Sequence, residues 1–412
     1  MLSILHPNVV PDIKSFAAGL LPIRQMETGK LSLVIKISKE AILAARTNGG
    51  FSFYLAPMKS TTGRTVSLMT AFFDDDDEPL VVATGLFAND PHSLDLLKLL
   101  TYKEADVFFF DEHSREWMSY RVTLHDGGSC LKRKQKIKLL EYHPATARSI
   151  LDNLHLWFGN RTPLDDRRSI KVKFEEALAP DDIFVLDATP EHNDYLGSAG
   201  YRRDSLTREE PGYFQERDIA SALRRVFKRD QIAINPLRPD TNKEILDVLV
   251  VTDTHILLIQ AKDSPNTKTS SRATLDRKRR KSLSQVDDAV RQIGGAARYL
   301  LKNQPAKFLI GGQEAELSIG PRSLVGIAIV KELFDDTGEP YVEACKTLAH
   351  LKGGGMAFDY ASFHAFSHHF ASEERFVKAL EKLIDRVLLE RSWTNPKDFV
   401  MDDILENLAP KA

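Results

Sequence analysis

The first half of the chain alternates short apolar runs with polar turns. Runs rich in β-branched and aromatic residues that are bounded by turn residues are typical of strands. Such runs lie between Leu31 and about Leu124, and they read LSLVIKI, FSFYLA, RTVSLMTAFF, LVVATGLF, DVFFF and WMSYRVTL. A helix is predicted from Ala145 to Phe158. Together these elements predict a β-rich α+β domain over residues 1–190.

The pattern of apolar and polar residues changes between the two halves. Between Thr189 and Gly212 the sequence is polar and is interrupted by Gly and Pro, with no sustained period. Such a stretch is typical of a linker, which we place at residues 191–212. From Tyr213 to Phe227 apolar residues then recur at spacings of three and four, which predicts an amphipathic helix.

The second half continues with strands and a longer helix. Two apolar runs, Ile245 to Val251 and Ile256 to Ala261, are separated by the short break TDTH and predict a hairpin. Ser284 is predicted to open a helix with a buried apolar stripe, and Leu324 to Val330 reads as a further buried strand. The order helix, strand, strand, helix, strand predicts an α/β domain over residues 213–412, with a mixed central sheet flanked by helices.

Polar residues stand at the ends of the predicted hairpin, EILDVLVVTDTHILLIQAKD. If its turn is centred on Asp253-Thr254, antiparallel pairing places Asp247 opposite Gln260. Period-two alternation puts Lys262 on the same face as Gln260. An acid, an amide and an ammonium group therefore meet at one end of the hairpin. A cross-strand ion pair between Asp247 and Lys262 is the purely structural alternative.

Glu216 is expected to join this group. It precedes Ile219, Ala220 and Leu223 by three, four and seven residues, so it lies on the helix face that packs against the sheet. A buried carboxylate is costly unless it is paired or binds a metal, and a divalent cation would offset that cost.

Three acidic residues near the hairpin are not assigned to the predicted site. Glu244, Asp253 and Asp263 are predicted to lie in solvated turns. Glu244 remains an alternative site residue if the strand begins with a bulge.

These residues resemble the PD-(D/E)XK nuclease superfamily, and within it the Mrr-like restriction endonucleases, whose motif reads Asp…Gln-x-Lys. Here the motif is Asp247…Gln260-Ala261-Lys262, preceded by the helix with Glu216 and followed by the glutamine-containing helix SQVDDAVRQIGGAARYL. The resemblance covers roughly Tyr213 to Val330. It implies a restriction-endonuclease-like domain that hydrolyses DNA phosphodiester bonds, in defence against foreign DNA. Gln260 replaces the usual acidic residue and removes one negative charge from the site.

The resemblance also implies roles for the site residues. Asp247, the side-chain oxygen of Gln260 and the backbone carbonyl of Ala261 would hold Mg²⁺, for which Mn²⁺ could substitute, and Glu216 would join directly or through water. Lys262 would orient the attacking water and neutralise developing charge.

Two other functions stay open. One is a catalytically inactive nuclease-fold protein that binds nucleic acid or serves as a scaffold, which Gln260 favours. The other is an RNA-directed nuclease, because phosphate chemistry does not distinguish the sugar. The first half is expected to act as a sensor, specificity or assembly module, and a homo-oligomer or a protein partner is compatible with that role.

A basic segment follows the motif at residues 264–281. It contains seven basic residues and one acid, Asp276. The basic residues are Lys268, Arg272, Arg277, Lys278, Arg279, Arg280 and Lys281. Its Ser and Thr content predicts a flexible loop that becomes ordered on nucleic acid, and a merely solvated loop is the alternative.

Composition changes this picture little. The 412 residues carry a formal net charge of -2, so any contact with a polyanion must come from a local patch. Cys130 and Cys345 lie far apart and predict no disulfide framework. Neither a secretory leader nor an apolar run of about 20 residues is apparent, so we expect a soluble cytoplasmic protein that does not enter membranes.

Other motifs are weaker. His364 and His368 have the spacing of a helical metal pair, but no HExxH motif accompanies them, so core or surface histidines are the favoured interpretation. The acidic run Asp74 to Glu78 is typical of a solvated loop. KRKQKIK, from Lys132 to Lys138, is either a phosphate-contacting strip or a strand edge protected by lysines.

Overall fold

The computed structural model divides the chain into two compact units. The first comprises Met1–Arg208 with Asn266–Arg272 and Asp402–Ala412, and the second comprises Glu209–Pro265 with Ala273–Met401. Most of the predicted linker at 191–212 lies outside the described residues. The structure describes residues 1–24, 29–60, 63–73, 79–84, 89–125, 139–140, 143–179, 185–186, 201–202, 206–207, 212–265, 267, 273–334 and 338–408.

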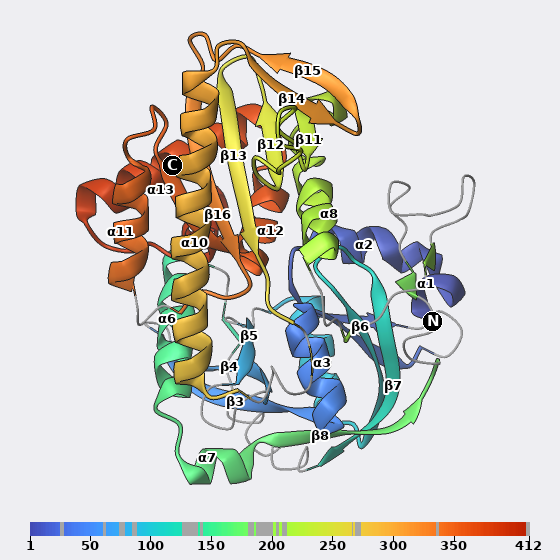
Figure 1. The fold of residues 1–412 in the computed structure, drawn as a ribbon. Coiled ribbons are helices and arrows are strands. Elements are labelled where there is room, and N and C mark those ends of the chain that lie inside the picture. The colour runs from blue at the N-terminus through green and yellow to red at the C-terminus, as the bar shows by residue number, and fades with distance from the viewer. Residues whose placement is uncertain are drawn as a thin grey trace. The chain divides into compact units, whose positions relative to one another are not determined.

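The first unit is built on a large mixed sheet (Figure 1). Its main path runs β1-β2-β6-β7-β8-β3-β4-β5, in which β2 and β6 are parallel and the other neighbours are antiparallel. The strands on this path are β1 (Gly19–Arg24), β2 (Leu31–Lys36), β3 (Gly50–Ser60), β4 (Gly63–Phe72), β5 (Leu80–Thr84), β6 (Glu104–Phe110), β7 (Glu116–His125) and β8 (Ile170–Ala177). The short strands β9 (Val185–Leu186) and β10 (Tyr201–Arg202) pair with each other, and β9 also pairs with β7.

Each predicted strand run of the first half overlaps a strand of this sheet, β2 to β7, although residues 85–87 of the run LVVATGLF lie outside the described residues. The predicted helix is α6 (Pro144–Gly159). Two helices were missed, α3 (Lys39–Asn48) and α4 (Pro91–Leu99), although each begins with a side-chain cap, Ser38 and Asp90 respectively. The remaining helices here are α1 (Leu2–Leu5), η1 (Pro7–Val9), α2 (Val10–Ser15) and α7 (Pro163–Arg168).

The turn between β6 and β7 buries charged residues. The Arg115 and Asp111 side chains are fully buried and form an ion pair at 2.6 Å. Trp117 Nε1 also donates to Asp111, at 2.8 Å. Glu116 accepts hydrogen bonds from the backbone N–H groups of Leu2 and Ser3 at 2.8 and 2.9 Å. Because each of these buried charges has a partner, the turn can hold the first helix against the sheet.

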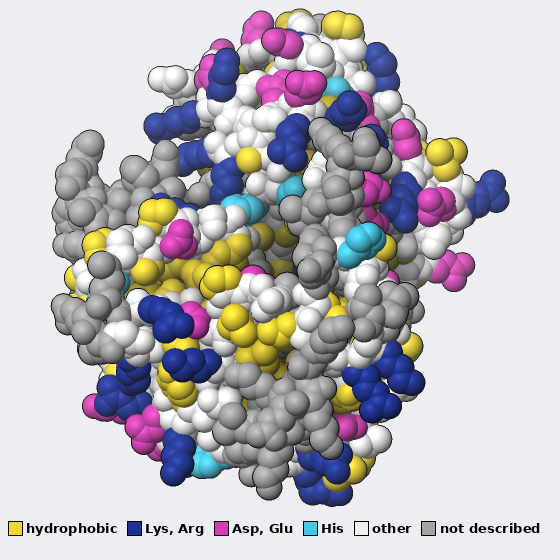
Figure 2. Space-filling model, turned by 180° about the vertical axis from the view of Figure 1, so that it is seen from behind, with side chains coloured by type: hydrophobic (Ala, Val, Ile, Leu, Met, Phe, Trp, Pro, Cys, Tyr) yellow, Lys and Arg dark blue, Asp and Glu magenta, His cyan; other side chains and the backbone are white. Residues whose placement is uncertain are grey.

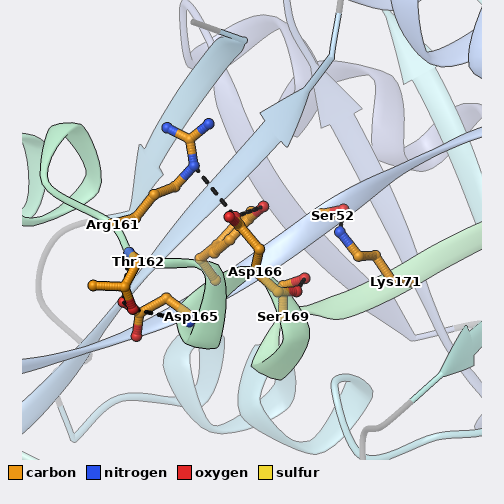
Figure 3. A network of polar contacts seen from close by, with 8 residues as sticks. Ser52, Arg161, Thr162, Asp165, Asp166, Ser169 and Lys171 are labelled. Carbon is orange, nitrogen blue, oxygen red and sulfur yellow. Dashed lines mark hydrogen bonds and ion pairs between the residues drawn. The ribbon is translucent and has the colours of Figure 1, made fainter. Parts of the chain in front are cut away.

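A second polar network fixes α7 to the sheet of the same unit. Thr162 caps α7 in a capping box. Figure 3 shows Arg161 and Asp166 pointing toward one another, and Arg161 Nε lies 3.3 Å from Asp166 Oδ1. Tyr54, buried on β3, donates its hydroxyl to the same carboxylate oxygen at 3.0 Å. These contacts account for the positions of the polar side chains, so the network is structural and does not indicate a binding site.

The second unit is built on a smaller mixed sheet in the order β11-β12-β13-β16-β17. The pairs from β11 to β13 are antiparallel, and those from β13 to β17 are parallel. The strands are β11 (Ile232–Ile234), β12 (Val248–Val251), β13 (His255–Lys262), β16 (Ser323–Val330) and β17 (Gly355–Asp359), with a separate hairpin of β14 (Ala306–Ile310) and β15 (Gln313–Leu317). The mixed sheet was predicted, but the short strand β11 was missed.

Helices cover both faces of this sheet. Its helices are α8 (Gly212–Leu223), η3 (Arg229–Gln231), α10 (Leu275–Lys302), α11 (Gly338–Leu348), α12 (Tyr360–His369) and α13 (Glu373–Glu390), and α14 (Pro396–Leu408) follows. Figure 1 shows α10 lying along β13 and β16, and α10 and α11 share one core with Ile256 and Leu258. Leu257 and Ile259, which alternate with those two residues, are also buried, so the opposite face is covered as well.

The start of α10 differs from the prediction. The helix begins at Leu275, after Thr274, and not at Ser284. The predicted stripe is buried and comprises Val286, Ala289, Val290, Ile293, Ala297 and Leu300. Apolar periodicity located the core-facing part of the helix but missed its exposed, charged first turns. No helix in the described part of the chain has the length and apolarity needed to cross a bilayer.

Two paired glycines allow α11 to approach the sheet closely. Gly326 on β16 pairs with Gly355 on β17, and Leu348 of α11 lies over them. A Cβ atom at Gly355 would lie 2.8 Å from the Gly326 carbonyl oxygen and 2.5 Å from Leu348 Cδ1. A larger residue would therefore force the helix and the strand apart.

Substituting Gly355 tests this packing. We expect Gly355→Ala to lower the free energy of unfolding by about 1–3 kcal/mol, because the core is overpacked. Gly294→Ala on α10 is the control, since a Cβ atom there would lie more than 4 Å from every described atom outside the adjoining backbone of its own helix. That change should raise stability by about 0.5–1 kcal/mol through helix propensity. Urea unfolding measures both, and equal effects of the two substitutions would contradict the packing argument.

Candidate active site

The predicted hairpin register is the one observed. β12 and β13 pair Val248 with Ile259 and Val251 with Ile256. One residue further along the same register, Asp247 stands opposite Gln260. Asp247 Oδ2 accepts the backbone N–H of Ala261 at 2.6 Å, and the Gln260 side chain also hydrogen-bonds to this carboxylate. Pairing therefore fixes Asp247 against the strand that carries the Gln-x-Lys part of the motif.

Glu216 lies close to the hairpin residues, as predicted. Its Oε2 accepts a hydrogen bond from Asn235 Nδ2 at 2.9 Å. The charges of Asp247 and Lys262 also shift the pKa of its carboxyl group. Glu216, Asp247, Gln260 and Lys262 are thus gathered at one end of the sheet, where α8 meets the hairpin.

The pKa values of the carboxyl groups at this site are raised. Burial raises the pKa of Asp247, against the hydrogen bonds from Ala261 and Gln260 and the charge of Lys262. Burial also raises the pKa of Glu216, which the Asn235 hydrogen bond lowers and Asp247 raises further. Desolvation and mutual repulsion both disfavour the ionised forms. A cation at this position would relieve both.

Glu244 is exposed, as predicted, but the charges of Asp247 and Glu216 act on its carboxyl group, so it remains the alternative site residue. Partial desolvation of its carboxyl group, then the charges of Asp247 and Glu216, raise its pKa to about 7, while Lys262 lowers it. Glu244 stands opposite Leu237 in an isolated bridge. Strand alternation disfavoured this position, because residues three apart on a regular strand point to opposite faces.

Asn235 was missed by the sequence reasoning. It follows β11, and its backbone N–H donates to the Asp247 carbonyl at 2.8 Å, so it stands opposite Asp247. Its φ of 49° lies in the left-handed region, which asparagine tolerates better than most residues. Extending the pairing from β12 to one more strand would have found it, but the three residues of β11 give almost no periodic signal.

The basic segment is only partly a loop. Lys268 and Arg272 lie outside the described residues. Arg277, Lys278, Arg279, Arg280 and Lys281 lie in the first turns of α10, which corrects the prediction of a loop that is unstructured up to residue 281. Arg279 packs over the Phe334 ring, 5.8 Å from its centroid, and lies 3.8 Å from Asp276.

Lys281 lies among other cations near the end of β13. Burial, then the charges of Lys331 and Arg277, lowers its pKa, and Asp263 opposes this shift. Lys331 directly follows β16, whose last residue, Val330, pairs with Lys262. We call Arg277, Lys281 and Lys331 the cationic cluster. It was not predicted as a unit, because Lys331 lies 50 positions after Lys281 in the sequence.

Gln285 attaches α10 to the segment that follows the motif. Its Nε2 donates to the Asp263 carbonyl at 2.9 Å and to Ser264 Oγ at 3.1 Å. These two hydrogen bonds fix the basic turns of the helix next to the end of β13.

The donor atoms suit a hard cation, although their arrangement is not that of a preformed cage. No group of three or more His, Cys, Asp or Glu side chains in the described parts of the chain is arranged to hold a metal. The carboxylate and amide oxygens of the site are nevertheless the ligands that Mg²⁺ prefers. The buried Oδ1 of Asn235 also has no hydrogen-bond partner among the described residues. The residues fit such an ion if the carboxylates close around it.

The weaker sequence motifs add no site. His364 is buried, and its Nε2 lies 2.7 Å from Arg225 Nη1, in keeping with a core histidine. The acidic run 74–78 and the lysine-rich run 132–138 lie outside the described residues. On the face drawn in Figure 2, basic and acidic side chains are interspersed, in keeping with the net charge of -2.

No family model matches the sequence, and no curated protein or solved structure matches it. The resemblance to the nuclease superfamily therefore rests on the residues and the element order of this chain.

Glu244 gives the protein a pH-dependent stability. Its pKa in the folded state is about 7, above the ordinary value of 4.5. The folded protein therefore binds the extra proton, and the free energy of unfolding falls as the pH rises from about 4.5 to about 7. Glu244→Gln should flatten this part of the curve and raise the Tm at pH 8, measured by thermal unfolding without divalent ions. The exposed Glu343→Gln on α11 is the control, and equal curves for Glu244→Gln and wild type would refute the assignment.

Proposed function

We propose that this protein is a Mg²⁺-dependent endonuclease that hydrolyses DNA phosphodiester bonds, with a restriction-endonuclease-like second unit. The observation that carries the proposal is the meeting of Asp247, Gln260 and Lys262 with Glu216 at one end of a mixed sheet. The order of helix, antiparallel strands, long helix and parallel strand supports it. An ion pair alone explains neither the position of Glu216 nor the excess of carboxylates.

The residues have distinct roles in this proposal. Asp247, the Gln260 side-chain oxygen, the Ala261 carbonyl and Glu216 would hold Mg²⁺ or Mn²⁺. When bound, the ion would supply Lewis-acid chemistry. The Gln260 side-chain N–H would donate to the Asp247 carboxylate. This hydrogen bond would orient the carboxylate and leave the Gln260 oxygen available for the ion. Lys262 orients the attacking water and neutralises charge that develops on the phosphate.

The cationic cluster supports a nucleic-acid substrate. Arg277, Lys281 and Lys331 lie near the strand end that carries Lys262. Phosphates bound there would be close to the carboxylates, and binding would release counterions. Since the molecule has a net charge of -2, affinity for DNA depends on this local group.

The setting follows from the resemblance. A cytoplasmic role in defence against foreign DNA, with the first unit as sensor, specificity or assembly module, is the proposed context. A homo-oligomer would allow cleavage of both strands.

An inactive nuclease-fold protein that binds nucleic acid or acts as a scaffold is the second candidate. Gln260 in place of an acid and the lack of a preformed three-carboxylate cage in the described residues favour it. An RNA-directed nuclease is distinguished from both by its substrate.

Cleavage assays test the chemistry. Asp247→Asn and Lys262→Ala are expected to lower the rate of plasmid cleavage with Mg²⁺ by about 10²-fold or more, since each removes a preorganised charge. Asp253→Asn, in the exposed turn of the same hairpin, is the matched control and should cut at the wild-type rate. Wild-type cleavage by either site variant would remove that residue from the mechanism. The same assay with an RNA substrate distinguishes an RNA-directed nuclease from one that cleaves DNA.

Salt dependence tests the cationic cluster. Replacing Arg277, Lys281 and Lys331 by Gln should weaken DNA binding, and the slope of log K against log salt should fall by about 1 for each phosphate that the variant no longer neutralises. Lys302→Gln, at the exposed far end of α10, is the control and should leave the slope unchanged. An unchanged slope in the triple variant would show that phosphates bind elsewhere.

A further inference from the structure

We propose that Asn235 is a positioning residue of the candidate active site, which holds the Glu216 carboxylate beside Asp247 for cation binding. This inference rests on the proposed function. It concerns a residue outside the Asp…Gln-x-Lys motif, on a strand that the sequence pattern did not reveal.

The hydrogen bonds of Asn235 connect two separate elements. Its side-chain Nδ2 donates to Glu216 Oε2 of α8 at 2.9 Å. Its backbone N–H donates to the carbonyl oxygen of Asp247 at 2.8 Å. One residue therefore ties the helix carboxylate to the backbone of Asp247 on the neighbouring strand. The carboxylates of Glu216 and Asp247 repel each other when ionised, so without such a bridge Glu216 would be expected to turn away.

The backbone at this position is adapted to the bridge. β11 ends at Ile234, and Asn235 adopts a φ of 49° immediately before Pro236. The left-handed conformation turns the side chain out of the regular alternation of the strand. Asparagine combines tolerance of this conformation with a side-chain N–H donor.

The other end of the amide adds a second observation. Asn235 Oδ1 is buried and has no hydrogen-bond partner within the described part of the chain. Rotating the amide by half a turn would bring this oxygen against the Glu216 carboxylate, which is repulsive. The observed orientation thus satisfies the carboxylate and leaves the oxygen of Asn235 unsatisfied. Such an arrangement is expected where an amide serves a charged neighbour and its oxygen faces a polar site.

Mn²⁺ binding to the full-length protein, measured by isothermal titration calorimetry, tests the inference. Asn235→Gly keeps the backbone conformation and removes the donor, and we expect it to lower Mn²⁺ affinity by about 10-fold or more. Asn235→Ala also removes the donor and introduces no charge, and it should also lose affinity. Asn242→Gly is the matched control, because Asn242 has a φ of 52° on the exposed part of the same segment.

A double-mutant cycle separates positioning from a general structural role. If Asn235 acts through Glu216, then Asn235→Gly should have little further effect on Mn²⁺ affinity in a Glu216→Gln background. Additive losses, or wild-type Mn²⁺ affinity in Asn235→Gly, would overturn the inference. The Tm of each variant without metal shows whether it is folded, and Asn235→Ala provides the test if Asn235→Gly is not.

The same measurements distinguish failure of the proposed function from failure of the role of Asn235. If the wild-type protein binds no Mn²⁺ and cuts no DNA, both the proposed function and this inference are overturned. If wild type binds Mn²⁺ and cuts DNA while Asn235→Gly is indistinguishable from it, only the role of Asn235 is lost.

Discussion

The pairing of β12 with β13 is the constraint on which the candidate site depends. Shifting the register by one residue would turn Asp247 to the other face of the sheet and separate it from Gln260. The short turn opposes this shift, because the Thr252 N–H donates to the His255 carbonyl at 2.9 Å and the loop length fixes the register of a hairpin. The 2.6 Å hydrogen bond from the Ala261 N–H to Asp247 is a direct consequence of that register.

Once the register is fixed, an excess of negative charge follows. Among the described residues, the charge of Lys262 acts on Glu216, Glu244 and Asp247, and the pKa of each acid is nevertheless raised. A protein that needed only stability would gain by replacing one of these acids. Under the proposed function, a cation would bind near these acids and offset their repulsion. The cationic cluster, formed by α10 and the residue after β16, would then supply the opposite charge that a phosphate requires.

The sequence predicted the parts of this site that depend on strong periodicity. The hairpin, its turn and the buried face of α8 follow from apolar spacing, and they led to Asp247, Gln260, Lys262 and Glu216. The residues that were missed or left as alternatives lie where periodicity ends. Asn235 follows a three-residue strand, Glu244 lies on an irregular segment, and Lys331 is brought near by the parallel pairing of β13 with β16. Local patterns contain no information about such pairing, and the exposed first turns of α10 were missed for a similar reason.

The most direct test is a crystal structure of the protein soaked with Mn²⁺, with the ion located by its anomalous scattering. We predict a peak about 2.1–2.3 Å from oxygens of Asp247 and Gln260, with Glu216 bound directly or through water and Lys262 beside it. A protein that cleaves DNA with Mn²⁺ but shows the ion bound away from Asp247 would contradict this prediction.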